Sequence, residues 1–137
     1  MTLKNEFSAP KIGDSIVFRK TMTVAEQAMF TGISGNLGAL YVDRGKAKAG
    51  GLKDMAVFEL AAASLLSTCL SRLAGPGFRI ARFETSFDQA VSVGATIEAS
   101  ATLTARTDAG LTFTLTLKND QSPFGAGEAV LVQIDGH

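Results

Sequence analysis

Two stretches in the second half of the chain alternate strictly between apolar and polar residues. In residues 97–105 every odd position is apolar and the even positions are Glu, Ser, Thr and Thr, and residues 111–117 alternate in the same way with Thr at every even position. Side chains of a β-strand point to alternate faces, so this period of two predicts two strands, each with one buried and one solvated face. Asp108, Ala109 and Gly110 between them are typical of a hairpin connection. The chain therefore needs a partner layer for the dry face of an antiparallel sheet.

The longest apolar stretch, residues 55–73, provides that layer. It carries Glu59, four hydroxyl residues and Arg72, whereas a membrane span needs about 20 residues with few or no charges. Its apolar residues cover nearly the whole helical circumference, so we expect a helix from about Asp54 to Leu73 that is buried on most sides. The run Gly75-Pro76-Gly77 ends it. A sheet that curls around this helix is the expected packing, in an α+β fold.

The remaining segments fit one domain of 137 residues around the same core. Thr23 followed by Glu26 has the spacing of a capping box, and Asp43 is a second candidate helix cap. We expect strands at residues 15–23, 79–90 and 128–134, helices at 24–33 and 44–49, and a loop at 36–41.

Composition excludes several classes of function. Thirteen basic residues balance thirteen acidic ones, so no broad electrostatic field favours nucleic acid or an anionic membrane. The single histidine is His137 and the single cysteine is Cys69, too few for a Cys/His zinc site or an internal disulfide. The first residues lack the basic-then-apolar profile of a signal peptide, and we expect a cytoplasmic protein. Catalysis would have to use carboxylates, amides, hydroxyls or backbone dipoles.

Four motifs resemble those of the MaoC-like acyl dehydratases and (R)-specific enoyl-CoA hydratases. SGNLGALYVD (34–43) resembles the loop S-G-D-x-N-P-x-H-x-D, and GGLKDMAVFELAAASLLS (50–67) resembles the helix entrance G-F-x-x-x-I-V-H-G-M-L-x-A-S-L-L-S. LAGPG (73–77) and SFDQAVSVGATIEASATL (86–103) resemble the following turn and strand. The resemblance covers residues 13–134. It implies a hotdog fold, a homodimer or higher homo-oligomer, and an acyl thioester carried on coenzyme A or acyl carrier protein, with no metal or cofactor.

The resemblance also implies which positions hold the active site. The family's catalytic Asp and His fall on Asn36 and Tyr41, and its second His falls on Phe58. The Gly whose backbone N–H polarises the thioester carbonyl falls on Glu59. The family's two hydroxyl positions are kept as Ser64 and Ser67, which implies contacts to the acyl thioester.

Glu59 is the only charge in the apolar part of the helix, and this makes it the first candidate for proton transfer. Burial favours the protonated form of a carboxyl group, which is how a carboxylate comes to serve as a general acid or base near neutral pH. Asn in place of Asp removes a base, and a phenol with an ordinary pKa of about 10 replaces an imidazole at position 41. The structural alternative for Glu59 is a carboxylate satisfied by backbone N–H groups or by an arginine such as Arg82, which is also a candidate for substrate binding.

Two classes of function follow. The first is a divergent hydratase or dehydratase acting on 2-enoyl or 3-hydroxyacyl thioesters, with Glu59 and Tyr41 in place of the missing pair. The second is a non-catalytic acyl-binding protein, or the partner subunit of an active hydratase. An acyl-CoA thioesterase that uses Glu59 is a third possibility. Fold analogy alone does not choose among them, because function resides in the site.

Overall fold

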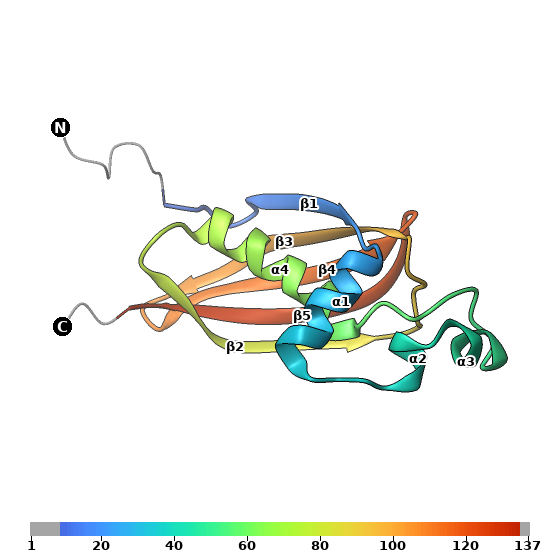
Figure 1. Cartoon of the computed structure of the whole chain (residues 1–137). Coiled ribbons are helices and arrows are strands. Elements are labelled where there is room, and N and C mark those ends of the chain that lie inside the picture. Colours follow the sequence, from blue (N-terminus) through green and yellow to red (C-terminus); the bar gives the residue numbers. More distant parts are fainter. Residues whose placement is uncertain (1–8, 135–137) are drawn as a thin grey trace.

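The computed structural model describes residues 9–134 and contains one five-stranded antiparallel sheet with a long helix lying across one face (Figure 1). The elements are β1 Ser15–Thr21, α1 Val24–Ser34, α2 Ala39–Val42, α3 Arg44–Ala49, α4 Glu59–Ala74, β2 Phe78–Phe87, β3 Thr96–Thr107, β4 Gly110–Asn119 and β5 Ser122–Gln133. The strands are ordered β1-β3-β4-β5-β2, so β1 and β2 form the two edges. Three shorter helices gather near the N-terminal end of α4.

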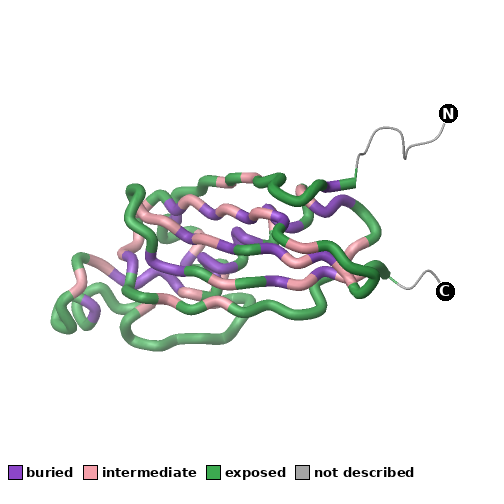
Figure 2. The backbone as a smooth tube through the Cα atoms, turned by 180° about the vertical axis from the view of Figure 1, so that it is seen from behind, coloured by how far each residue is buried: buried purple, intermediate pink, exposed green. Residues whose placement is uncertain are grey.

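The core lies between α4 and the inward-facing residues of the central strands. Alternate residues of β3 and β4, including Ile97, Leu103, Phe113 and Leu117, are fully buried, and the residues between them are more exposed. Figure 2 shows this alternation along the strands from the side opposite α4. The expected fold class, an antiparallel sheet wrapped around a central helix, is confirmed. No helix within residues 9–134 is long and apolar enough to cross a membrane.

The long helix begins five residues later than the sequence predicts. Residues 54–58 are not helical, because the chain here runs extended beside residues 91–93: the Val57 N–H donates to Val91 O (2.7 Å) and the Val93 N–H donates to Met55 O (2.8 Å). Glu59 therefore occupies the first turn of α4 instead of its interior. This correction places its carboxylate at the positive end of the helix dipole.

Other boundaries also differ from expectation. Residues 39–41, expected as loop, form the single helical turn α2 together with Val42. Strands β1 and β2 end at Thr21 and Phe87, two and three residues before their expected ends. Strand β5 starts at Ser122, six residues before the expected start, although residues 122–127 read SPFGAG and have Phe124 as their one strand-favouring residue. Pairing with β4 on one side and β2 on the other overrides that weak local preference.

The capping box at the start of α1 is confirmed. The Thr23 side chain accepts the Ala25 N–H, and Glu26 Oε1 accepts the Thr23 N–H at 2.7 Å. The Thr23 hydroxyl and the Thr23 backbone N–H both donate to Glu26 Oε1, and these two hydrogen bonds lower the pKa of Glu26 to about 2. The box fixes the first turn of α1, which packs over the start of α4 (Figure 1).

Replacing Thr23 by Ala is expected to lower the free energy of unfolding by about 0.5–2 kcal/mol, since a helix cap is lost. Because the folded-state pKa of Glu26 is depressed, its stabilising contribution is present above pH 4.5 and is lost as pH falls towards 2. The variant should therefore show a shallower loss of stability across that acid range. Urea titrations at pH 7, 4 and 3 measure both effects, and Thr23→Ser, which keeps the hydroxyl, should behave as the parent protein does.

Candidate functional site

Tyr41 and Glu59, separated by 18 positions in the chain, meet at the start of α4. The Tyr41 hydroxyl donates a hydrogen bond to Glu59 Oε1 at 2.7 Å. Both side chains are partly buried. The hydrogen bond from Tyr41, together with partial burial and the negative charge of Glu59, raises the pKa of the Tyr41 phenol to about 12. At neutral pH the phenol is therefore the donor and Glu59 is the acceptor of the pair.

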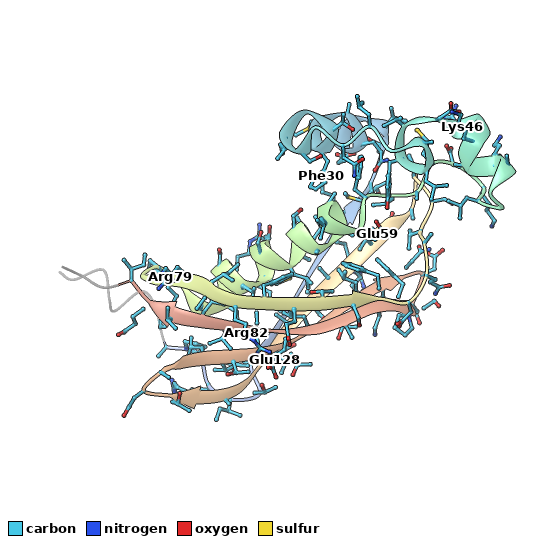
Figure 3. The ribbon with its side chains drawn as sticks, turned by 90° about the horizontal axis from the view of Figure 1, so that it is seen from below. Phe30, Lys46, Glu59, Arg79, Arg82 and Glu128 are labelled. Carbon is cyan, nitrogen blue, oxygen red and sulfur yellow. The ribbon has the colours of Figure 1, made fainter. Side chains whose placement is uncertain are left out.

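An aromatic stack holds this pair in place. The Tyr41 ring stacks on Phe58 with centroids 4.5 Å apart and planes 13° apart, and Phe30 of α1 packs on Phe58 at 4.9 Å. Phe58 is 2% exposed, so it supports the Tyr41 ring from within the core. In Figure 3, Phe30 and Glu59 are both at the end of the molecule where α1 crosses the start of α4.

Asn36 and Tyr41 approach each other around Gly38. A Cβ at position 38 would lie 3.0 Å from Asn36 Oδ1 and 3.2 Å from the Tyr41 ring, so a larger residue would push the two apart. Asn36 Oδ1 accepts the Gly38 N–H at 2.8 Å, and the Asn36 N–H donates to Ser34 Oγ at 3.1 Å. The amide oxygen of Asn36 thus closes its own turn, while the adjacent Gly35, at φ 75°, supplies the left-handed residue that ends α1.

The two serines of α4 hydrogen-bond within their own helix. Ser64 Oγ donates to Ala61 O, and Ser67 Oγ donates to Ser64 O at 2.6 Å. Ser64 also lies in an apolar groove between α1 and α4, whose walls include Met29, Phe30 and Ile33. Met29 and Ile33 are 66% and 80% exposed, so this groove has an accessible apolar wall next to the site.

Arg82 lies on the sheet, away from the Tyr41–Glu59 pair. Its guanidinium pairs with Glu84 at 2.7 Å and with Glu128 at 3.4 Å, and Figure 3 shows Arg82 beside Glu128 and apart from Glu59. The Glu59 carboxylate therefore accepts its hydrogen bond from Tyr41 and is not paired with Arg82. Cys69 is fully buried, and burial raises the pKa of its thiol, which fits an inert core residue.

Gln27 is a site residue that sequence reasoning missed. It is 4% exposed, and among residues 9–134 it is the one polar residue that is buried. Its side chain bonds to backbone groups of Tyr41, Ala56 and Phe58. The one indication in the sequence is that Gln27 lies three positions before Phe30, and so on the same face of the predicted helix as this apolar residue.

No protein-family model matches this chain, and no curated protein sequence does either. The similarity to solved structures is strong. The (R)-hydratase from A. caviae involved in PHA biosynthesis is 26% identical, with a TM-score of 0.85 over 90% of this chain and 97% of that one. The chain has the fold of the MaoC-like hotdog hydratases and dehydratases.

Two further structures share the MaoC-like hotdog fold with this protein. The R-hydratase PhaJ1 from Pseudomonas aeruginosa is 15% identical, with a TM-score of 0.83 over 90% of this chain and 81% of that one. The MaoC-like dehydratase from Rhodospirillum rubrum is 17% identical, with a TM-score of 0.73 over 93% of this chain and 95% of that one. At these identities the comparison concerns the fold alone. The protein is thus hydratase-like in fold, and its site residues have to be judged on their own chemistry.

Proposed function

We propose that this protein binds acyl thioesters and catalyses the interconversion of 2-enoyl and 3-hydroxyacyl thioesters, with Glu59 as the group that transfers the proton. The observation that carries the proposal is the 2.7 Å hydrogen bond from Tyr41 to Glu59 at the first turn of α4 in a hydratase-like fold. Asn36 and Tyr41 stand where the family resemblance expects the catalytic Asp and His. Glu59 provides the carboxylate that those two positions no longer supply.

The proposed hydration step balances with one carboxylate. Glu59 takes a proton from water as the water oxygen bonds to the β-carbon, and the π electrons of the double bond move to the α-carbon and thioester oxygen. The Glu59 carboxylic acid then returns the proton to the α-carbon. Tyr41 is a neutral phenol at neutral pH, and its hydrogen bond keeps one oxygen of the Glu59 carboxylate oriented.

The start of α4 supports the charge that develops on the thioester oxygen. The first N–H groups of a helix have no intrahelical acceptor, and Phe58, the residue before α4, makes no side-chain cap. While Glu59 is ionised, its own charge is stabilised by the positive end of the helix dipole. Once Glu59 accepts the proton, that charge is gone and the same dipole acts on the enolate.

The groove between α1 and α4 suits an acyl chain. Its walls include Met29, Phe30, Ile33 and Leu65, and Ser64 gives it one hydroxyl. Burial of a hydrocarbon chain against this wall gains about 25 cal/mol per Å² of apolar surface. Affinity for the thioester should therefore rise with chain length until the groove is filled.

The experiment is incubation of the purified protein with 2-enoyl-CoA esters of increasing length, with three readouts: formation of 3-hydroxyacyl-CoA, release of free thiol, and binding by calorimetry. Hydration supports the proposal. Thiol release without hydration points instead to a thioesterase. Binding without either reaction points to the non-catalytic acyl-binding or partner-subunit function, and an absence of binding overturns the thioester ligand itself.

We further propose that two copies of the chain associate through the edge strand β2. Helix α4 packs chiefly against β1 and β3, which leaves apolar residues of β2 on the same side of the sheet exposed: Ile80 is 42% and Phe83 36% exposed. The backbone edge of β2 that faces away from β5 is free to pair within residues 9–134. Antiparallel pairing of two β2 strands about Phe83 would set Arg82 of each copy opposite Glu84 of the other, which is a self-complementary charge pattern.

Replacing Phe83 by Asp is expected to convert this dimer to a monomer, because the two-fold axis would bring two carboxylates together in an apolar contact. Light scattering should give twice the chain mass of 14.3 kDa for the parent protein and the single chain mass for the variant. Ile134→Asp, an exposed apolar position outside β2, serves as the matched control and should remain dimeric. A parent protein that scatters as a single chain would contradict the association.

A further inference from the structure

The side chain of Gln27 is buried in α1 and satisfied at both ends. Its Nε2 donates to Tyr41 O at 2.8 Å and to Ala56 O at 2.9 Å, and its Oε1 accepts the Phe58 N–H at 3.2 Å. A primary amide has two donor hydrogens and one acceptor oxygen, and all of these functions are used here. Gln27 is only 4% exposed, so its side chain makes these hydrogen bonds inside the protein and not with bulk water.

The three backbone partners of Gln27 belong to the two segments that carry the proposed catalytic pair. The backbone carbonyl of Tyr41 accepts one of these hydrogen bonds. The Phe58 N–H donates another, and Phe58 directly precedes Glu59. The Ala56 N–H donates to Leu40 O at 2.9 Å, which joins the same two segments at one further point. Gln27 thus bridges the segment with the phenol and the segment with the carboxylate from a third element, α1.

The position of α1 is itself fixed on both sides of Gln27. The capping box of Thr23 and Glu26 holds its first turn, and Phe30 packs on Phe58 at 4.9 Å. A rigid helix that holds two separate segments through one amide sets the separation of those segments. The distance between Tyr41 Oη and Glu59 Oε1 depends on that separation, since within residues 9–134 the side chains of Tyr41 and Glu59 hydrogen-bond to each other and to no further side chain.

We propose that Gln27 is a positioning residue that holds Tyr41 within hydrogen-bond distance of Glu59. The inference about catalysis rests on the proposed function, whereas the geometric effect on the Tyr41–Glu59 pair does not. Loss of the amide would leave the carbonyl groups of Tyr41 and Ala56 and the N–H of Phe58 buried without partners. The two segments would then shift to satisfy these groups elsewhere, and the phenol and carboxylate would separate.

Tyr41 gives a direct optical readout of this pair. It is the only tyrosine in the chain and there is no tryptophan, so the absorbance of tyrosinate reports Tyr41 alone. The hydrogen bond to Glu59, partial burial and the charge of Glu59 together raise the pKa of this phenol. At pH 11 a phenol with a pKa of about 12 is about a tenth ionised, whereas one with an ordinary pKa of about 10 is about nine-tenths ionised.

The test compares Gln27→Met and Gln27→Asn with the parent protein at pH 11, under conditions in which circular dichroism shows a folded chain. Met preserves the length of the side chain and removes every hydrogen bond; Asn keeps the amide but is one methylene shorter, so it provides a milder variant if Met prevents folding. We expect the ionised fraction of Tyr41 to rise several-fold in both, as it should in Glu59→Gln. Leu111→Ala, a core change beside Ala74 at the far end of α4, is the control and should leave it unchanged.

A folded Gln27→Met or Gln27→Asn protein whose Tyr41 ionises as in the parent would overturn the proposal. So would an equal rise in Leu111→Ala, because the effect would then reflect lower stability alone. The readout needs no substrate, so it stands even if the parent protein turns over no thioester. Where turnover is observed, the two Gln27 variants should lose kcat more than they change KM, as expected for a misplaced proton-transfer group.

Discussion

Replacing Glu59 by Gln should lower the rate of enoyl-thioester hydration by about 10²–10⁴-fold, the usual contribution of a positioned general acid–base group. Gln is nearly the same size, and its carbonyl oxygen can still accept the Tyr41 hydrogen bond, so the 2.7 Å contact has a neutral replacement. What is lost is the ability to take and return a proton. Binding of the thioester should change little, because the apolar groove between α1 and α4 is untouched.

Glu98→Gln is the matched control for this change. Glu98 carries the same side chain but lies on β3, where it pairs with Arg19. We expect its hydration rate to equal that of the parent protein. Initial rates with a 2-enoyl-CoA ester, together with calorimetric affinities, separate the two variants. Equal rates in Glu59→Gln and the parent would remove Glu59 from the mechanism while leaving the acyl-binding groove in place.

Glu59→Gln also predicts a change in the titration of Tyr41. The pKa of the phenol is raised first by its hydrogen bond to the Glu59 carboxylate, then by partial burial and by the adjacent negative charge. Gln offers only a weaker, neutral hydrogen bond and no charge, so the pKa of Tyr41 should fall in the variant. Because the folded-state pKa lies above the ordinary value of about 10, the pair stabilises the fold below that pH and loses this contribution as pH rises towards 12. The variant should therefore lose less stability than the parent protein between pH 10 and 12.

The elements that sequence predicts well are those whose causes are local. Residues 97–105 and 111–117 alternate with a period of two, and both lie within observed strands. Thr23 and Glu26 are three positions apart and form their capping box without help from the rest of the fold. In each case the side chains that decide the structure are neighbours in the chain.

The features that sequence misses depend on distant contacts. The start of α4 is delayed because residues 54–58 pair with residues 91–93, far along the chain. The early start of β5 needs two neighbouring strands to hold a Gly-rich segment extended. Glu59 could be singled out as a lone charge, yet its partner Tyr41 is 18 positions away on another element. Gln27 has no sequence motif at all, since its role comes from three backbone groups that only the fold brings together.

Gly127 is the position where a single methyl group should damage the fold most. It lies on β5 between Thr85 of β2 and Leu115 of β4. A Cβ at this position would overlap the Glu84 carbonyl oxygen and lie 2.8 Å from Thr85 Cα. Both are backbone atoms of a paired strand, so no flexible side chain can move aside. β2 would have to move away from β5 around Glu84 and Thr85.

Gly127→Ala is therefore expected to lower the free energy of unfolding by about 3 kcal/mol or more, and Tm by about 10 °C. Gly32→Ala makes the same chemical change in α1, where an added Cβ meets nothing within 4 Å. Alanine has the higher helix propensity, so this control should raise stability by about 0.5–1 kcal/mol. Thermal unfolding should show a lower Tm than the parent for Gly127→Ala and a higher Tm for Gly32→Ala. A Gly127→Ala protein as stable as the parent would mean that β2 is not held against β5 at this register, and the edge proposed for association would then lie elsewhere.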